Sequence, residues 1–293
     1  MHAKLMAGAV LLTISSLLQP ASAAPDWQMV AKAFGKSGTE MPDGVYRVGL
    51  PRTDLKVSLD GVALKPGFAL GGWVAFEPMG NQAMVMGDVV LTQDEVNPVM
   101  KKLGGIEITA LHNHLLRAEP MTLYMHVFGQ GDPVPLAIAL HAGLALSKTP
   151  MGGGAQPQAA PQIEFDAAGV DQTMGYKGKA NGAVYQFTIP RAEPVEENGM
   201  EVPAAMGSAI AINFQSTGGG KAAITGDFVL TAKEVNPVIK AMQDDGIEIT
   251  ALHSHMLDEQ PRLFFMHFWA NDDAQKLANG LRAALDKVAV KKS

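Results

Sequence analysis

The chain repeats itself, and this constrains its fold more than any other feature of the sequence. Residues 87–100 recur as residues 226–239 with ten of fourteen positions identical, and residues 105–126 recur as 246–267 with thirteen of twenty-two identical. Chance does not produce matches this long, and a period of about 140 residues is too long for a solenoid unit. The sequence therefore predicts two homologous domains packed about a pseudo-twofold axis.

The first residues have the pattern of a secretory signal peptide. Lys4 precedes a mostly apolar run, and Ala21-Ser22-Ala23 matches a cleavage site. The run is shorter than the ~20 residues that span a bilayer, and no later segment is apolar enough to do so. We therefore expect residues 1–23 to be removed and the mature chain to lack a membrane span, with a retained anchor as the alternative.

Two lobes are expected in the mature chain, an N-terminal repeat at residues 25–148 and a C-terminal repeat at residues 163–293. Residues 149–162 between them are rich in Gly and Pro and lack apolar periodicity. Such a composition is typical of a flexible linker.

Composition narrows the class of protein. Hydrophobic residues make up 47% of the chain and charged residues 18%, which is typical of a soluble globular protein. The net charge of -6, a pI near 5.7 and the lack of a dense Lys/Arg cluster argue against a nucleic-acid partner. The absence of cysteine removes disulfides, thiolate ligands and cysteine nucleophiles. We expect a periplasmic or secreted protein whose metal ligands, if any, are His, carboxylates or Met.

Each lobe shows the same order of expected elements, beginning with a strand over residues 83–91 in the first. Thr92 with Glu95 then forms a capping box that predicts a helix, with a start at Asn97 ahead of Pro98 as the alternative. In the first lobe this helix is followed by strands over residues 105–114 and 122–128 and by a helix from Asp132. In the second lobe we expect a helix after Thr231, strands over 247–257 and 262–269 and a helix from Asp273.

This order predicts an α+β fold. Each lobe has a β-α-β-β-α core, in which two helices pack on an antiparallel-rich sheet, and further short strands are expected near residues 45–76 and 184–214. The duplication relates the two homologous lobes by a pseudo-twofold axis.

Six of the eight histidines are matched between the lobes. The two trios are His112, His114 and His126 in the first lobe and His253, His255 and His267 in the second. Alternate residues of a strand share a face, so Ile106, Ile108 and Ala110 are expected to point the same way as the first two histidines.

A hairpin turn near Glu119 would place His112 opposite His126 and His114 opposite Tyr124, with the same arrangement in the second lobe. Opposed side chains have Cβ atoms ~5 Å apart, so three imidazoles would converge in each lobe.

Three convergent neutral imidazoles suit a divalent transition metal, with zinc or copper favoured by export, and leave a fourth position open. Met125, Met256 and Met266 adjoin these histidines and are expected to face the other way. Two other interpretations stay open: a metal-free ligand or acid–base site, and core histidines satisfied by hydrogen bonds.

Other polar and aromatic residues are weaker candidates. Glu107 and Glu248 are expected to point away from the His face. Asp88 and Asp227 are expected to be structural or to support the ligands from behind. The aromatic residues on the His face are Tyr124, Phe128, Phe265 and Trp269. Arg52 and Arg191 are expected in turns, with anion binding as the alternative, and His141 is expected to be structural or at the surface.

The chain resembles a known family of exported bacterial proteins. Residues 87–99 and 105–116, followed by Tyr124-Met125-His126, look like the LppY/LpqO family. The resemblance covers both lobes and implies export, but it implies no activity, because the family's biochemical role is not established. Its mycobacterial namesakes are lipoproteins, and lipid anchoring does not carry over to a chain without cysteine.

A second resemblance is to the cupins. His112-x-His114 with Glu119 and His253-x-His255 with Glu259 resemble the metal-binding motif of that family. The two glutamates do not align with each other in the repeat, and helices interrupt the strands, so a double cupin is a distant alternative.

Three functions follow as hypotheses. The first is a periplasmic or secreted metal-binding protein with a three-His site in each lobe, acting as a carrier, a sensor or a metalloenzyme. The second is a metal-free binding module for an envelope component or small molecule. The third is a hydrolase or lyase in which histidine is the acid–base group.

Overall fold

The computed structural model describes residues 24–41, 43–152 and 163–292. The expected signal peptide, residues 1–23, lies outside the described residues, as do residues 153–162 of the expected linker.

The first lobe contains twelve helices and strands among its described residues. They are α1 (Trp27–Phe34), β1 (Thr39–Glu40), β2 (Tyr46–Pro51), β3 (Ser58–Leu59), β4 (Val62–Ala63), α2 (Pro66–Ala69), β5 (Gly71–Met79), β6 (Gln82–Thr92), α3 (Gln93–Lys102), β7 (Glu107–His112), β8 (Thr122–Gly131) and α4 (Pro133–Leu144).

The second lobe repeats this order, with a 3-10 turn, η1, in the place of α2. Its elements are α5 (Ala167–Met174), β9 (Lys179–Asn181), β10 (Val184–Pro190), β11 (Glu196–Glu197), β12 (Met200–Glu201), η1 (Ala204–Met206), β13 (Ala209–Gly218), β14 (Lys221–Thr231), α6 (Ala232–Asp244), β15 (Glu248–His253), β16 (Leu263–Asp273) and α7 (Ala274–Leu285).

Each lobe is built on one six-stranded antiparallel sheet. The strand order is β1-β2-β5-β6-β8-β7 in the first lobe and β9-β10-β13-β14-β16-β15 in the second. The short pairs β3–β4 and β11–β12 form separate hairpins. The two orders match strand for strand, which confirms the α+β duplication.

Helices cover one face of each sheet. In the first lobe Val30 of α1, Val99 of α3 and Leu140 of α4 are buried in one core with Val48 of β2 and Val127 of β8. The same layer in the second lobe is made by α5, α6 and α7. Fully burying an aliphatic side chain contributes about 1.5–3 kcal/mol, so these faces hold the helices on the sheets.

The capping boxes form as expected. Thr92 accepts from the backbone of Glu95 while the Glu95 carboxylate accepts from the Thr92 N–H, and α3 begins there. Pro98 lies inside α3, so the alternative start at Asn97 is wrong. The equivalent box begins α6.

Each lobe has a further helix that the sequence prediction lacked. Asp26 caps α1 by accepting from two backbone N–H groups, and Gly35 ends it in the left-handed conformation. Asp166 caps α5 by accepting from the Gly169 N–H, and Gly175 ends that helix in the left-handed conformation. Three main helices per lobe therefore replace the expected two.

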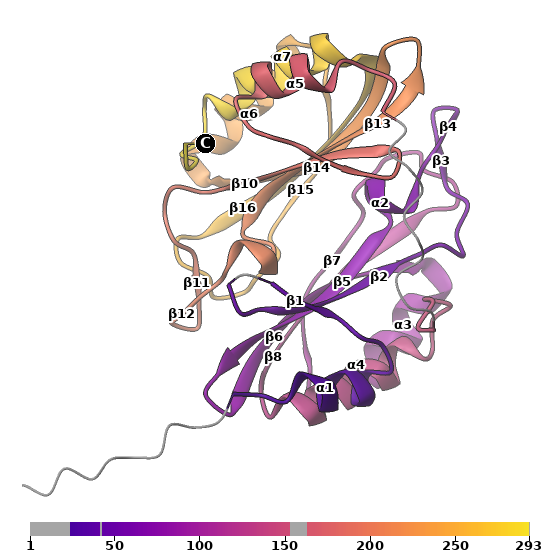
Figure 1. Ribbon diagram of the computed structural model, residues 1–293, viewed down its shortest axis with the longest axis vertical. Helices are drawn as coiled ribbons and strands as arrows, with labels where there is room; N and C mark the ends of the chain where they lie inside the picture. Colours follow the sequence, from indigo (N-terminus) through magenta and orange to yellow (C-terminus); the bar gives the residue numbers. More distant parts are fainter. Residues whose placement is uncertain (1–23, 42, 153–162, 293) are drawn as a thin grey trace, which may run out of the picture.

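The two sheets face each other, and the helices lie on the outside (Figure 1). Met84, Met86 and Phe128 of the first sheet are buried in the same core as residues of the second lobe. The Thr250 hydroxyl of the second lobe donates to the carbonyl of His114 in the first at 2.6 Å. Helix, sheet, sheet and helix thus form four layers, with the inner faces of both sheets at the lobe interface.

None of the helices in the described part of the chain has the length and apolar character needed to cross a membrane.

Candidate metal centre between the lobes

The two histidine trios meet at one place, between the two sheets. Rings from opposite lobes stack in three pairs, with centroid distances of 3.5 Å for His112–His253, 3.7 Å for His114–His267 and 3.7 Å for His126–His255. The pairing follows the pseudo-twofold axis: exchange of the lobes leaves the pair His112–His253 unchanged and interchanges the other two pairs. The sequence predicted a three-His site in each lobe and left open whether the two sites are separate or shared, and the structure brings both trios into a single shared cluster.

The strand register differs from the expected one by two residues. His126 pairs with Ala110, and His112 pairs with Tyr124. His114 lies beyond the end of β7, with its ring stacked on Tyr124 at a centroid distance of 3.3 Å. Because the shift is even, His112 and His126 keep the shared face that the spacing predicted, and His114 joins them through its ring contacts with His112 and Tyr124.

A β-bulge near the start of β7 changes which residues accompany them. The register skips a residue between Ile108, paired with Val127, and Ala110, paired with His126. The bulge reverses the alternation, so Ile108 packs against the helix-side core and does not share the His face as expected.

The same reversal brings the two strand glutamates to the His side. Glu107 pairs with Phe128 and Glu248 with Trp269, whereas both glutamates were expected to point away. Glu248 accepts two hydrogen bonds from the Arg117 guanidinium of the first lobe, at 2.9 and 2.8 Å. Its role is an exposed ion pair between the lobes, at the rim of the interface.

Two aspartates lie in the centre itself, where the sequence assigned them a supporting role at most. Asp88 pairs across strands with His126, and Asp227 with His267. The Asp88 carboxylate is 3.8 Å from His126 Nε2, and the Asp227 oxygens are 3.8 Å from His267 Nε2 and 3.7 Å from His255 Nε2. The signal for them was in the sequence, because an acidic residue inside an apolar strand run is costly to bury without a partner.

Every histidine of the centre has a buried nitrogen without a partner. All six Nε2 atoms, together with one carboxylate oxygen each of Asp88 and Asp227, have no hydrogen-bond partner among the described residues. A buried polar group left unsatisfied costs about 1–3 kcal/mol, so such a concentration indicates that the centre is built for something else to bind.

In three of the six rings the backbone holds the opposite ring nitrogen. Nδ1 of His267 contacts the Gly226 carbonyl at 2.7 Å, and Nδ1 of His112 and His253 contact the carbonyls of the following residues at 3.3 Å. A carbonyl can only accept, so Nδ1 carries the hydrogen and, in a neutral ring, Nε2 carries the free lone pair.

Burial keeps these rings neutral. Burial and the neighbouring His253 lower the pKa of His112 to about 3. Burial lowers the pKa of His253 to about 4. The pKa values of the other four lie well below the usual range of histidine, mainly through burial.

The aspartates shift in the opposite direction. Burial raises the pKa of Asp88 to about 7, and burial with the nearby Asp88 charge raises the pKa of Asp227 well above its usual range. Both side chains are largely buried, at 14% and 19% exposure. A cation in the centre would reverse this penalty by favouring the ionised carboxylates.

Three groups in the centre have ligand atoms that all lie within 4.8 Å of one another. They are His112 with His114 and His126; Asp227 with His255 and His267; and His112 with His253 and His255. The first two groups share no residue, so the centre offers ligands for one or two ions.

The methionines beside the histidines do not all face away as expected. Met125 and Met266 are fully buried in the cores of their lobes. Met256 lines a small cavity of about 10 Å³ together with His126 and His255. Its thioether side chain therefore borders the centre.

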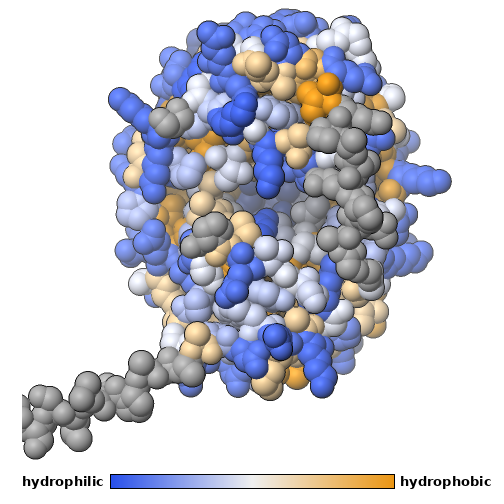
Figure 2. Space-filling view, in the orientation of Figure 1, coloured by the Kyte–Doolittle hydropathy of each residue, from blue (hydrophilic) through white to orange (hydrophobic). Residues whose placement is uncertain are grey.

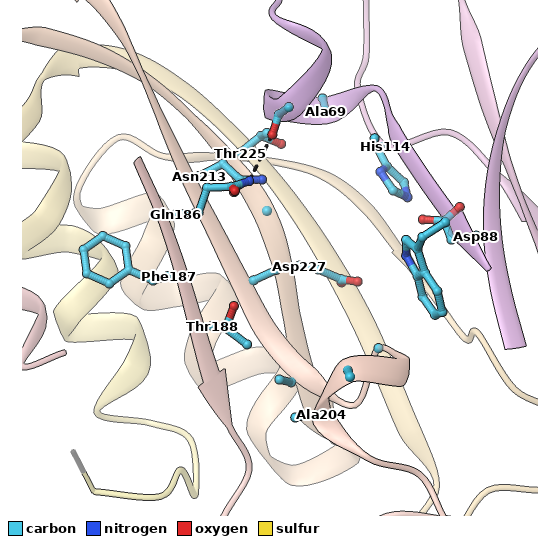
Figure 3. A pocket seen from close by; sticks show the side chains of 18 of the residues that line it. Ala69, Asp88, His114, Gln186, Phe187, Thr188, Ala204, Asn213, Thr225 and Asp227 are labelled. Atoms are coloured by element: carbon cyan, nitrogen blue, oxygen red, sulfur yellow. Dashed lines mark hydrogen bonds between the residues drawn. The ribbon is translucent and has the colours of Figure 1, made fainter. Parts of the chain in front are cut away.

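A larger cavity of about 560 Å³ opens beside the centre, lined by both lobes. In Figure 3, Asp227 extends from the second lobe toward the side on which Asp88 and His114 of the first lobe lie. Figure 2 shows the corresponding hollow between the two halves of the molecule. The centre thus forms part of the wall of a pocket large enough for a small molecule.

The cupin alternative is wrong for this chain. The sheets are open and are covered by helices on one face, so they do not close into barrels. Glu259, the expected cupin glutamate, accepts hydrogen bonds from the Leu263 N–H at 3.0 Å and from Arg262 at 3.2 Å. Glu119 is exposed.

The remaining candidates are structural. Arg52 is fully buried and donates to Glu95 at 2.7 Å and to Asp54 at 2.8 Å, so it anchors the start of α3. Arg191 makes the equivalent bond to Glu234 at 2.9 Å. These arginines have carboxylate partners of their own.

His141 is structural, as predicted, with its Nδ1 on the Phe34 carbonyl at 2.9 Å.

Comparisons with known proteins place the chain in a family. A family profile described as Domain of Unknown Function (DUF1259) matches residues 28–146 and again residues 168–287. No curated protein matches the chain. A solved structure, that of a trimeric bacterial microcompartment shell protein PduB, aligns with 12% identity over 84% of this chain and 87% of that one; its TM-score of 0.20 is too low to carry an argument. Because the two profile matches together span more than half of its length, the chain belongs to the family described as Domain of Unknown Function (DUF1259), of which it carries two tandem copies.

Proposed function

We propose that the centre between the lobes binds one or two divalent transition-metal ions, with zinc or copper as the natural occupants. The observation that carries this proposal is the set of six buried imidazole Nε2 atoms and two carboxylate oxygens without partners, gathered at one place. A metal ion would satisfy several of them at once, and few other small ligands accept electron pairs from so many directions.

The donor set fits these metals. Neutral imidazole and carboxylate ligands suit Zn²⁺ and Cu²⁺, and no thiolate is required. The contact between Nδ1 of His267 and the Gly226 carbonyl is the outer hydrogen bond by which proteins orient a metal-binding imidazole. Because burial keeps the pKa values of the rings low, protons do not compete for Nε2 at neutral pH.

Only a small closure is needed for ligation. The ligand atoms within a group lie within 4.8 Å of one another, and tetrahedral ligands at about 2.1 Å from zinc lie about 3.4 Å apart. Rotation of the stacked rings about their side-chain bonds supplies a change of that size.

The geometry favours a metal centre that acts on a ligand over a simple carrier. A group such as His112, His114 and His126 supplies three protein ligands, which leaves a fourth position for water or substrate. The adjoining cavity of about 560 Å³ offers room for that substrate. A metalloenzyme or a metal-dependent binding protein is therefore the favoured role.

One alternative is supported by the same cavity. A metal-free binding module would use the cavity for an envelope component or small molecule, with the histidines as acceptors of ligand hydrogen bonds. A hydrolase or lyase with histidine as the acid–base group is the third candidate. The low pKa values of His112 and His253 argue against it, because these rings would be unprotonated and only weakly basic at neutral pH.

Calorimetric titration with Zn²⁺ and the absorption spectrum of the Co²⁺-loaded protein test the proposal. We expect micromolar or tighter binding and a Co²⁺ spectrum of four- or five-coordinate type, both lost in the variant His126→Ala/His267→Ala. His141→Ala removes a histidine outside the centre and should leave both unchanged. A folded protein that binds neither ion would refute the proposal.

We also propose export to the periplasm or the medium, and membership of the LppY/LpqO group of exported proteins. The pattern of residues 1–23 and the phrases shared with that group support both. Sequencing the N-terminus of the protein recovered from periplasm or medium tests export, with cleavage after Ala23 as the expected result and a retained N-terminus as the contradicting one.

A further inference from the structure

The cavity beside the centre has a charged wall that the metal ligands do not explain. Arg47 of β2 lines the cavity, and its guanidinium lies over the Trp73 ring at 4.1 Å from the ring centroid. Its Nη1 donates to the Ala205 carbonyl of the other lobe. Stacking on one face and a single hydrogen bond on one nitrogen hold the guanidinium in a fixed orientation.

The rest of this guanidinium has no partner. Among the described residues, no carboxylate lies within 4.0 Å of Arg47, and its Nε and Nη2 donate no hydrogen bond. Burial lowers the pKa of Arg47 to about 10 while the nearby Asp88 charge raises it, so the guanidinium remains charged at neutral pH. Asp88 therefore acts on Arg47 through its field without forming an ion pair, and the Nε and Nη2 groups are not among the buried atoms that lack a partner, so they are accessible to a ligand.

The second lobe shows that the charge is not needed to hold the lobes together. Gln186 occupies the position equivalent to Arg47, and its Nε2 donates to the Gly67 carbonyl of the first lobe at 3.0 Å. A neutral amide thus makes the same contact between lobes that Arg47 makes with Ala205. The contact between the lobes therefore does not explain why this position carries a positive charge in the first lobe.

The Arg47 guanidinium and the centre lie within the reach of one short molecule. The guanidinium lies over Trp73 of β5, and Trp73 pairs directly with Asp88 of β6, across an adjacent-strand spacing of ~4.8 Å. The second lobe lines the cavity with neutral polar side chains such as Asn213 and Thr225.

We infer that the cavity binds a small organic monocarboxylate, with its carboxylate on the Nε/Nη2 edge of Arg47 and its other end toward the His–Asp centre. The planar fork of arginine matches a carboxylate through two parallel hydrogen bonds. The carboxyl side chains that line this cavity are those of Asp43, Asp88 and Asp227, which disfavours a dianion such as phosphate.

The metal-facing end of this ligand rests on the proposed function, whereas the arginine-facing end does not. A carboxylate held at Arg47 would present a neighbouring oxygen or carbonyl to the open coordination position of the metal. The substrate class is then a short carboxylic acid that carries a second oxygen donor.

Calorimetric titration with a panel of monocarboxylates tests the inference. The panel runs from acetate through lactate to mandelate, with lactamide and mandelamide as neutral matches and inorganic phosphate as the competing anion. The proteins are wild type, Arg47→Gln, which copies the residue of the second lobe, and Arg117→Gln, which removes an equal charge outside the cavity, each titrated with and without Zn²⁺.

We expect at least one hydroxy acid to bind wild type and Arg117→Gln alike, with affinity at least about tenfold lower in Arg47→Gln. The neutral amides should bind weakly to all three proteins. Absence of binding by every acid, equal affinity in Arg47→Gln, or a preference for phosphate would overturn the inference. Carboxylate binding that depends on Arg47 but not on Zn²⁺ would uphold the inference while removing support from the metal proposal, so the two failures are distinguishable.

Discussion

His112 and His253, equivalent residues of the two repeats, stack with ring centroids 3.5 Å apart on the pseudo-twofold axis. Neither lobe alone contains this contact, so the centre exists only because the duplicated domains pack face to face. Two domains that each bring three histidines to one inner face produce one shared site, and a change in either lobe alters the ligands available to both.

The metal affinity should depend on pH through the aspartates. The raised pKa of Asp88, about 7, means that a metal ion must displace a proton from this carboxyl below that pH, whereas the low pKa values of the histidines remove them from the competition. We expect the apparent Zn²⁺ affinity to rise from pH 5 to pH 8 and then to level off. Zinc titrations over this range check it. In Asp88→Asn/Asp227→Asn the dependence should flatten, and an unchanged slope would contradict the account.

The aspartates should also set the stability of the metal-free protein. The pKa of Asp88 is higher in the folded chain than in the unfolded chain, so the folded state binds more protons between pH 4 and pH 7. Stability contributed by this group is present below the unfolded value and is lost as pH rises through about 7. Below the unfolded pKa of histidine the six buried histidines change stability in the opposite direction, so the decline is measured as the difference in urea unfolding between the chelator-treated wild type and Asp88→Asn. Excess Zn²⁺ should reverse this difference. Equal pH profiles with and without metal would argue against it.

Asp227 should contribute to metal binding directly. It belongs to a ligand group with His255 and His267, so Asp227→Asn should reduce Zn²⁺ affinity about 10–100-fold, the usual effect of losing a metal-site carboxylate or its support. The matched control is Asp94→Asn, an exposed aspartate on α3. Equal affinities for the two variants would exclude Asp227 from the centre's ligands.

Glu95 should contribute to the stability of the folded protein and not to metal binding at the centre. Its carboxylate accepts from Arg52, from the Thr92 N–H and from the Lys148 N–H. Glu95→Gln leaves the Arg52 guanidinium with one carboxylate partner fewer, which costs about 3 kcal/mol for a buried pair.

Denaturant unfolding of Glu95→Gln checks this, with the exposed Glu119→Gln as control. The hydrogen bonds from Arg52 and the backbone lower the pKa of Glu95 despite its burial, so its contribution is present above the unfolded pKa and is lost as pH falls below it. Loss of metal binding without loss of stability would contradict the assignment.

Much of the architecture could be predicted from the sequence, because it is encoded locally. The capping box of Thr92 and Glu95 and the shared face of His112 and His114 depend only on spacing along the chain. The missed helices α1 and α5 also carry local signals, a capping aspartate before each and a glycine after it.

The register and the shared centre could not be predicted in the same way. The bulge at Thr109 has no glycine that would mark it in the sequence. It turns Ile108 to the other face of the sheet. The stacking of His112 on His253 depends on how two domains dock, for which periodicity within one domain holds no information. Asp88 and Asp227 enter the centre only through cross-strand pairing with His126 and His267.

Elemental analysis of the protein purified without a His tag, after equilibration with micromolar zinc or copper, shows whether the centre between the lobes holds a metal. We expect one or two ions per chain in the wild type and in His141→Ala. We expect a loss in His112→Ala/His253→Ala, because this variant alters two of the three ligand groups. A folded wild-type chain that retains no transition metal, or a double variant that retains as much as wild type, would contradict metal binding at the centre.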